Sequence, residues 1–460
     1  MRKPAQRPSK APEGIPPGLD SHVPDLKLIA REIFRDSLAA VDIPRVMREK
    51  LTRSGSLLTA GNTTLDLAPY RSVCVVAIGK ASVAMSRGLS KLLEPDILVS
   101  GILVAPQDSI ASVAGFRAIA AGHPLPDAGS LTAARAILDL LAGADAHTLI
   151  FFLLSGGGSA LVELPRDPRV TLADLRDLYR LLVNCGAPID EINTVRKHLS
   201  AVKGGRLAAA APAATKLTIG ISDVPEGRES ALASGPTLPD PTTTADARRV
   251  LERYNLVPKL PPTYREIFSR PELIPETPKP GDPAFDNNKF LLLLGSNDLI
   301  EHARQAAEEK QCVTVCDNST DDWPVGEAAD HLLVRLDRLR NANPGHRVAL
   351  IAGGELSSPV IGDGVGGRNS AFVLNCVEKI AGKKIAVLSA GTDGKDGSSP
   401  AAGAVADGET LKRARAANLD PQGFERRSDS YNLFRQLGDA IQTGPTGNNL
   451  RDLRILLAES

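Results

Sequence analysis

The sequence is poor in the features that mark several large classes of protein. Aromatic side chains make up only 3% of the 460 residues, which argues against the stacked aromatic surfaces that bind single-stranded nucleic acid. With 54 basic and 54 acidic side chains the formal net charge is zero, and this balance gives no reason to expect a nucleic-acid partner. Because no apolar run approaches the roughly 20 residues of a membrane-spanning helix, we also expect no membrane association.

Cysteine is scarce as well. The five cysteines are odd in number and scattered, which indicates a reducing compartment rather than a framework of disulfides. The one close pair, Cys312 and Cys316, lies in an alternating strand-like run, and we interpret it as small strand residues rather than a zinc site. Residues 1–21 are rich in Pro, Lys and Arg and lack the apolar stretch of a signal peptide. They predict a disordered tail on a cytoplasmic protein.

Six short apolar runs, in contrast, end abruptly in small and polar residues. Runs of about 4–8 apolar residues without alternation predict strands that are buried on both faces of a parallel sheet. In open α/β sheets, ligands bind beyond the carboxyl ends of such strands. The pattern is therefore typical of an α/β enzyme. The six runs lie at 73–78, 149–154, 216–221, 290–294, 348–352 and 385–388.

Helical patterns alternate with these runs, which predicts sheets flanked by helices. A chain of 460 residues exceeds what one hydrophobic core usually serves, and eight prolines between residues 256 and 288 interrupt regular structure. We therefore predict an α/β fold with two α/β lobes that face each other across a cleft, mainly parallel sheets and a Rossmann-like first lobe. The predicted boundaries are a tail at 1–21, a first lobe at 22–256, a Pro-rich linker at 257–288, and a second lobe at 289–457 that ends in a charged segment near 451–460.

The most glycine-rich strand end is Ser155-Gly156-Gly157-Gly158-Ser159. Its three glycines let backbone amides approach a ligand closely, and the start of a following helix favours negative charge. The segment lacks the spaced Gly and Lys-Ser/Thr of a Walker loop, and Leu161 stands where a hydrolase elbow needs Gly. We predict phosphate binding here; a tight strand-to-helix turn without a ligand is the alternative.

Three basic side chains are candidates for contact with an anion. Lys80, beside Gly79 at a strand end, suits a compact positive charge aimed at a phosphate, although a solvated surface lysine fits equally well. Arg196 and Lys203 lie two helical turns apart and share a face, which allows an anion pocket. A solvated basic face is the usual alternative for such a run.

Acidic residues at two further strand ends suggest proton transfer or metal binding. Asp223 follows the run at 216–221 and suits magnesium binding or proton abstraction from a hydroxyl, with helix capping as the alternative. Asp393 and Asp396 belong to a Gly-rich segment that is either a metal site or a turn. Residues 362–367 fit G-x-G-x-x-G, but the acid that a dinucleotide site requires after the next strand is missing. Alternatively, this segment is a loop that presents Arg368 to a phosphoryl group.

Taken together, these motifs resemble those of the class II glycerate kinases, whose C-terminal part is called the MOFRL domain. The resemblance covers about residues 25–457 and implies transfer of the ATP γ-phosphoryl group to D-glycerate, giving 2-phosphoglycerate, with Mg²⁺ as helper. The expected partners are therefore the small-molecule substrate and the nucleotide. The motifs occur in one order, at 79–80, 154–165, 193–208, 222–224, 233–242, 353–355, 366–369, 391–397 and 443–447.

Carried over position by position, the proposed catalytic lysine, aspartate and arginine of the family fall on Lys80, Asp223 and Arg368. Phosphoryl transfer depends mainly on positioning and charge neutralisation, which a lysine, an arginine and Mg²⁺ supply. We expect Mg²⁺ at Asp223 and Asp393. We expect D-glycerate at Arg196, Lys203 and Asp393, and ATP at Ser155, Gly156, Gly157, Gly158, Ser159, Asn297, Gly353, Gly354 and Glu355.

The chain departs from the family pattern at three places. It has Glu226-Gly227 where Gly-Asp is usual, Ser370-Ala371 where Gln-Glu is usual, and Ser398-Ser399-Pro400 where Pro-Thr-Asp is usual. These changes remove carboxylates from the predicted cleft. One alternative is therefore a catalytically weak nucleotide-binding homologue. Because relatives of the family have also carried the label hydroxypyruvate reductase, a reductase that uses NAD(P)H is another, and the incomplete dinucleotide motif ranks it behind the kinase. The sequence leaves open whether the chain is a monomer or a homodimer.

Overall fold

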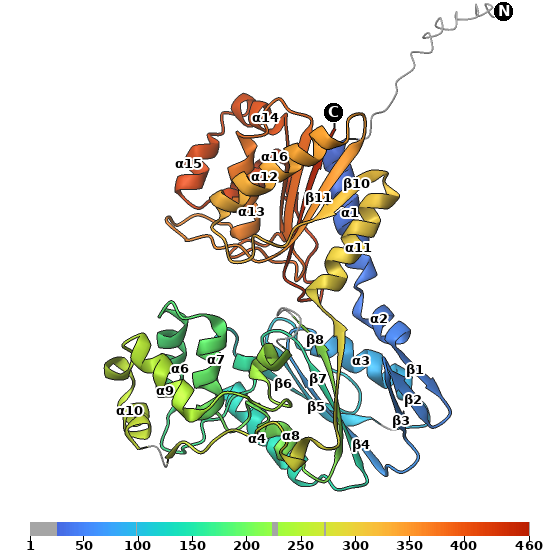
Figure 1. Cartoon of the computed structure of the whole chain (residues 1–460), viewed down its shortest axis with the longest axis vertical. Coiled ribbons are helices and arrows are strands. Elements are labelled where there is room, and N and C mark those ends of the chain that lie inside the picture. The colour runs from blue at the N-terminus through green and yellow to red at the C-terminus, as the bar shows by residue number, and fades with distance from the viewer. Residues whose placement is uncertain (1–24, 98, 223–228, 271–272, 460) are drawn as a thin grey trace, which may run out of the picture.

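The computed structural model describes residues 25–97, 99–222, 229–270 and 273–459. These residues form two lobes stacked along the long axis of the molecule, each built around a six-stranded sheet (Figure 1). Helices flank both sheets, so the α/β fold class predicted from the sequence is confirmed. In the part of the chain that the structure describes, no helix is long and apolar enough to cross a membrane.

The sheet of the first lobe is parallel throughout, in the order β6-β5-β4-β7-β8-β9. Every residue of the central strand β7 is buried, as its uninterrupted apolar run predicts. The strands are β4 (Ser72–Ile78), β5 (Ser100–Pro106), β6 (Phe116–Ala121), β7 (Thr148–Leu154), β8 (Thr215–Ile221) and β9 (Asn288–Leu294).

Helices cover both faces of this sheet. Val75 and Ala77 of β4 pack with helix α3 (Ser82–Leu93), whereas Val76 and Ile78 pack on the opposite face with α4 (Ala128–Ala142). A separate core joins four helices beside the sheet: α6 (Leu172–Val183), α7 (Ile189–Leu199), α9 (Thr244–Arg253) and α10 (Pro262–Ser269). Shorter elements are α5 (Gly158–Leu161), α8 (Arg206–Ala209), η1 (Glu229–Ser234) and the antiparallel strands β1 (Leu51–Ser54), β2 (Leu57–Ala60) and β3 (Thr63–Asp66).

The sheet of the second lobe is mixed, in the order β10-β11-β15-β12-β13-β14, which differs from the predicted mainly parallel arrangement. The C-terminal strand β15 lies between β11 and β12 and is antiparallel to both. All seven of its residues are buried, so the segment interpreted from the sequence as a charged end is a central strand. The strands are β10 (Cys312–Cys316), β11 (Arg347–Gly354), β12 (Ile385–Gly391), β13 (Gly403–Asp407), β14 (Ala440–Ile441) and β15 (Asp452–Ala458).

Two groups of helices cover the second sheet. One face packs with α1 (Leu26–Ala40) and α11 (Ser296–Glu309), within the same apolar core that runs into the first lobe. The other face packs with the remaining helices of this lobe, which are α12 (Val325–Ala342), α13 (Arg368–Val377), α14 (Thr410–Ala416), α15 (Pro421–Arg426) and α16 (Ser430–Leu437).

The chain passes between the lobes at places that differ from the predicted boundaries. Helix α1 lies against the second lobe (Figure 1), whereas α2 (Ile43–Lys50) packs on α3 of the first lobe. Strand β9 is the edge of the first sheet, so the second passage is at Gly295, directly before α11. The Pro-rich segment contains helical turns, η2 (Val257–Lys259), α10 and η4 (Pro283–Phe285), because proline is favourable in the first turn of a helix.

Candidate active site

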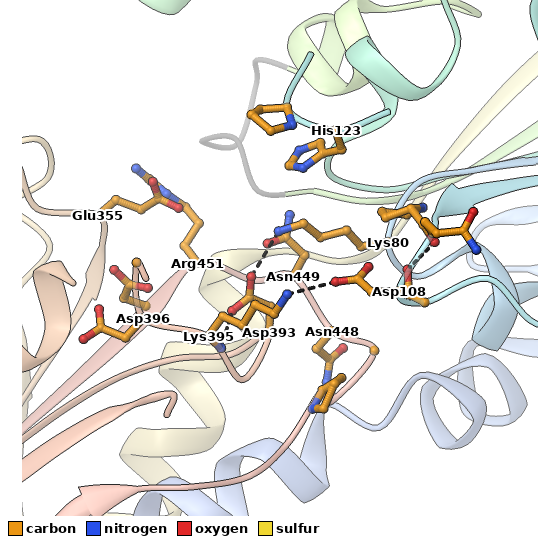
Figure 2. A pocket seen from close by; sticks show the side chains of 18 of the residues that line it. Lys80, Asp108, His123, Glu355, Asp393, Lys395, Asp396, Asn448, Asn449 and Arg451 are labelled. Carbon is orange, nitrogen blue, oxygen red and sulfur yellow. Dashed lines mark hydrogen bonds and ion pairs between the residues drawn. The ribbon is translucent and has the colours of Figure 1, made fainter. Parts of the chain in front are cut away.

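A cavity of about 840 Å³ lies between the two lobes (Figure 2). The first lobe contributes Lys80 after β4, Asp108 after β5 and His123 after β6. The second lobe contributes loops after β11 and β12, the start of α13 and the residues before β15. The cavity is therefore lined mainly from the carboxyl ends of strands, as expected for α/β sheets.

Two ion pairs connect the lobes across this cavity, and both are drawn in Figure 2. Lys80 Nζ lies 3.0 Å from Asp393 Oδ2, and Lys395 Nζ lies 2.9 Å from Asp108 Oδ2. The hydrogen bond from Lys395 lowers the pKa of Asp108. Each lobe thus contributes one cation and one carboxylate to the bridge.

The backbone around Lys80 is held by the glycine-rich loop after β7. The amide of Lys80 donates to the carbonyl of Gly156 (3.0 Å), and the amide of Ala81 donates to the buried hydroxyl of Ser155 (3.0 Å). Gly79 has φ +125°, and a Cβ there would lie 2.2 Å from Ser155 Oγ. The close contact between residue 79 and Ser155 therefore requires glycine, and Ser155 supports the loop that carries Lys80.

Arg368 stands at the start of α13, where Asp396 accepts the amides of Asn369 and Ser370 (both 2.9 Å). Asp396 is thus engaged as a helix cap, and burial raises its pKa. The Arg368 guanidinium lies 2.9 Å from Glu355 Oε1 and 3.2 Å from Asp452 Oδ1. Burial lowers the pKa of Arg368, but the hydrogen bond and charge of Asp452 outweigh it and raise that pKa overall.

A second cavity, of about 440 Å³, adjoins the first. The two share four lining residues, His123, Pro124, Glu355 and Arg451. The second cavity is also lined by Gly156, Gly157 and Ser159 of the predicted phosphate loop and by Tyr179, Asn193 and Arg196. This part of the glycine-rich loop therefore faces a cavity.

The structure separates the two basic residues that share a helical face in the sequence. Arg196 is 8% exposed and lines the second cavity, with its guanidinium carbon 4.3 Å from the centre of the Tyr179 ring. Lys203 is 1% exposed and lines neither cavity; its Nζ lies 2.8 Å from Glu163 Oε2. Burial lowers the pKa of Lys203. We therefore leave Lys203 out of the substrate site.

The remaining predicted residues lie in different surroundings. Glu355 lines both cavities. The carbonyl oxygens of Gly353 and Gly354 accept hydrogen bonds from the Arg454 guanidinium. Asn297 lines neither interlobe cavity but a third one of about 500 Å³, together with Ser222. Asp223, predicted as a catalytic residue and metal ligand, and Glu226 lie outside the described residues.

Carboxylates in the larger cavity already have partners. Asp393 accepts from Lys80 and from the Lys395 amide (3.0 Å), and Asp452 binds Arg368. Within the described ranges, no group of three His, Cys, Asp or Glu side chains could hold a metal. Mg²⁺ is commonly bound by one or two carboxylates together with substrate phosphates rather than by a protein cage, and Asp393 fits that mode.

Sequence reasoning missed several side chains of the larger cavity. Asp108 and His123 follow strands β5 and β6, but β6 has exposed residues and forms no apolar run. Burial and then the charge of Lys80 lower the pKa of His123. Arg451 precedes β15. Because β15 is antiparallel to β11 and β12, it begins at the edge of the sheet where those two strands end. A search for polar residues after apolar runs could therefore have found Asp108, but not His123 or Arg451.

Known proteins match this chain over most of its length. The model of a domain of unknown function, DUF4147, matches residues 29–269, and that of the MOFRL family matches residues 348–452. The D-glycerate 2-kinase of Thermotoga maritima is 34% identical, over 94% of this chain and 98% of the relative. A putative hydroxypyruvate reductase of Agrobacterium vitis is 37% identical, over 85% of this chain and 88% of the relative.

The fold leads to the same group of proteins. The crystal structure of glycerate kinase from Thermotoga maritima superposes with a TM-score of 0.80 at 33% identity, and the match covers 94% of this chain and 99% of that one. The family resemblance inferred from the motifs is therefore confirmed. The chain belongs to the class II glycerate kinase family, with a DUF4147 domain in its N-terminal part and a MOFRL domain in its C-terminal part.

Proposed function

We propose that the protein transfers the γ-phosphoryl group of ATP to the 2-hydroxyl of D-glycerate, giving 2-phosphoglycerate, in the two joined cavities between the lobes. The observation that carries this proposal is that Lys80 of the first lobe and Arg368 of the second line one cavity. A relative that is 34% identical over nearly its whole length is named D-glycerate 2-kinase, which supports the choice of substrate.

The larger cavity suits a nucleoside triphosphate in size, and cations of both lobes line it together with carboxylates such as Asp108, Asp393 and Asp452. Its volume of about 840 Å³ lies within the range of about 300–1,000 Å³ of small-molecule sites. Both lobes contribute cations to it, Lys80 from the first and Arg368, Lys395 and Arg451 from the second. Fixed cations in a site that excludes water stabilise the charge that is spread over a phosphoryl group during transfer.

In the proposed mechanism Lys80 and Arg368 bind the transferred phosphoryl group and neutralise its charge. The carboxylates that now hold them, Asp393 for Lys80 and Glu355 with Asp452 for Arg368, orient each cation toward the cavity. Asp393 is the candidate Mg²⁺ ligand among the residues that the structure describes. Bound Mg²⁺ would further neutralise the charge of the phosphates. Asp223 orients or deprotonates the glycerate hydroxyl; this role rests on its place directly after Ser222 at the end of β8.

A reductase is the second candidate because of the relative from Agrobacterium vitis that carries that name. The G-x-G-x-x-G segment does not support it. A Cβ on Gly362 or Gly364 would lie within 2.6 Å of the Arg427 carbonyl oxygen, and one on Gly367 would lie 2.3 Å from Asp396 Oδ1. The three glycines of the motif allow close packing on Arg427 and Asp396, so packing explains the motif without a dinucleotide.

One assay separates the candidates. The protein is incubated with D-glycerate, ATP and Mg²⁺, and separately with hydroxypyruvate and NADH. Formation of ADP that depends on glycerate, with the product identified as 2-phosphoglycerate by phosphorus NMR, supports the proposal. Loss of NADH supports the reductase, and nucleotide binding without turnover supports a weak homologue.

A further inference from the structure

The smaller interlobe cavity contains a buried cation that the chemistry at Lys80 and Arg368 does not use. Arg196 is 8% exposed, and its Nε has no hydrogen-bond partner among the described residues. A guanidinium carries five N–H donors and is always charged. Leaving the Nε donor buried without a partner costs free energy, and an anion in the cavity that Arg196 lines would offset that cost.

Other buried side chains hold Arg196 in place. Its guanidinium stacks on the ring of Tyr179, 4.3 Å from the ring centre. The Tyr179 hydroxyl hydrogen-bonds to the Glu163 carboxylate and lies 3.1 Å from the carbonyl oxygen of Ser159 in the glycine-rich loop. Tyr179 is 2% exposed and Glu163 is 2% exposed. Tyr179 therefore connects the arginine with the glycine-rich loop, which also lines the cavity.

The charges of this group do not cancel. Glu163 is directly paired with Lys203, at 2.8 Å, so its charge is already balanced by one cation. Arg196 adds a second cation to this group. It forms no ion pair with any other residue that the structure describes. Among Glu163, Lys203 and Arg196 one positive charge is in excess, and Arg196 carries it. The cavity lining also contains the carboxylates of Asp321, Asp322 and Glu355, so the cavity suits one carboxylate at Arg196 better than a triphosphate.

The cation that the two cavities share is already held by a carboxylate. Arg451, which lines both cavities, is paired with Asp321 at 2.7 Å. The smaller cavity measures about 440 Å³ against about 840 Å³ for the larger. Size, together with the position of Arg196, thus assigns the nucleotide to the larger cavity and the small acid to the smaller one.

We propose that the smaller cavity is the acceptor subsite, in which Arg196 binds the carboxylate of the hydroxy acid and Tyr179 is a positioning residue for Arg196. This inference rests on the proposed function. It moves Gly156, Gly157 and Ser159 from the nucleotide to the acceptor, and it restricts the substrate class to small hydroxy acids that carry a carboxylate.

Steady-state kinetics of Arg196→Gln, Arg196→Lys and Tyr179→Phe test the proposal. We expect Arg196→Gln to raise KM for D-glycerate roughly 10- to 100-fold, the scale of one charge-assisted hydrogen-bonded pair. The KM for ATP and kcat at saturating glycerate stay within about threefold, as for an interaction made equally in ground and transition states. Arg196→Lys rescues part of the loss, because it restores the charge but not the planar pair of donors.

Tyr179→Phe keeps the stacked ring and removes the hydroxyl. We expect it to raise KM for D-glycerate about 3- to 10-fold, without a change in KM for ATP. Arg206→Gln is the matched control, since Arg206 is 7% exposed, donates to the Lys197 carbonyl (2.9 Å) and lines neither interlobe cavity. It lowers the melting temperature and leaves KM for glycerate unchanged.

The neutral amide D-glyceramide gives an independent readout. The wild-type protein should prefer the acid over the amide, and Arg196→Gln should reduce that preference at least tenfold. A rise in KM for ATP instead of glycerate would assign the smaller cavity to the nucleotide and overturn the proposal, and so would unchanged KM values in folded Arg196→Gln. If the wild-type protein does not phosphorylate glycerate at all, the proposed function fails. Calorimetric binding of D-glycerate to wild type and Arg196→Gln then decides the subsite separately.

Discussion

Replacement of Lys80 by alanine separates catalysis from stability more clearly than any other single change. The lysine lines the larger cavity, and its ion pair with Asp393 has an N–O distance of 3.0 Å with side chains 28% and 26% exposed. A partly exposed pair of this kind contributes about 0–1 kcal/mol to stability. We therefore expect Lys80→Ala to lower the melting temperature by no more than about 4 °C.

The expected effect on turnover is much larger. If Lys80 neutralises the transferred phosphoryl group, its loss removes a preorganised charge from the site, which typically lowers kcat by about 10²- to 10³-fold, or roughly 2.7–4 kcal/mol of barrier. The assay measures ADP formation at saturating ATP and D-glycerate, together with a melting curve of each variant. A folded Lys80→Ala protein with kcat within threefold of wild type would refute the role of Lys80.

Asp108→Asn is the control for the bridge between the lobes. It breaks the second interlobe ion pair, between Asp108 and Lys395 at 2.9 Å, but removes no cation from the cavity. If kcat falls equally in Asp108→Asn and Lys80→Ala, the lobes need the bridge, and the charge of Lys80 has no special part in catalysis. A loss confined to Lys80→Ala assigns the effect to its charge.

Three further predictions concern the same site. Arg368→Lys should lower kcat by about 10²-fold or more, measured as ADP formation, since a single ammonium cannot reproduce the planar fork that binds Asp452; wild-type turnover would contradict it. Asp223→Asn should lose rate at an unchanged melting temperature if the residue acts on the substrate, and near-normal turnover would leave only a capping role. For His123, burial and the charge of Lys80 lower the pKa from 6.5, so the unfolded chain binds this proton more strongly. Stability therefore falls as the pH drops through 6.5, and His123→Gln should make the melting temperature less dependent on pH between about 5 and 7; equal slopes would contradict this.

The sequence predicted the candidate site best where a side chain follows a buried apolar strand. Lys80 follows β4 of the parallel sheet, and Glu355 and Asp393 follow β11 and β12, which run in the same direction on either side of the antiparallel β15. With Arg368 these residues line one cavity. The rule works because parallel strands end at the same edge of a sheet, whatever their order within it. Residues that reach the cavity from other positions, such as Arg451 before the antiparallel strand β15, give no such signal.

By itself the sequence determined the α/β class, the family and the position of most buried strands, because these depend on local runs of apolar residues and on short motifs. Only the tertiary structure decided which strands pair. It placed β15 in the centre of the second sheet and β9 at the edge of the first, and these pairings join residues far apart in the chain. It also decided the surroundings of charged side chains. Arg196 and Lys203 look alike in the sequence, but Lys203 meets the buried carboxylate of Glu163, 40 residues away, whereas Arg196 faces a cavity, since the partner of a buried charge is selected by packing.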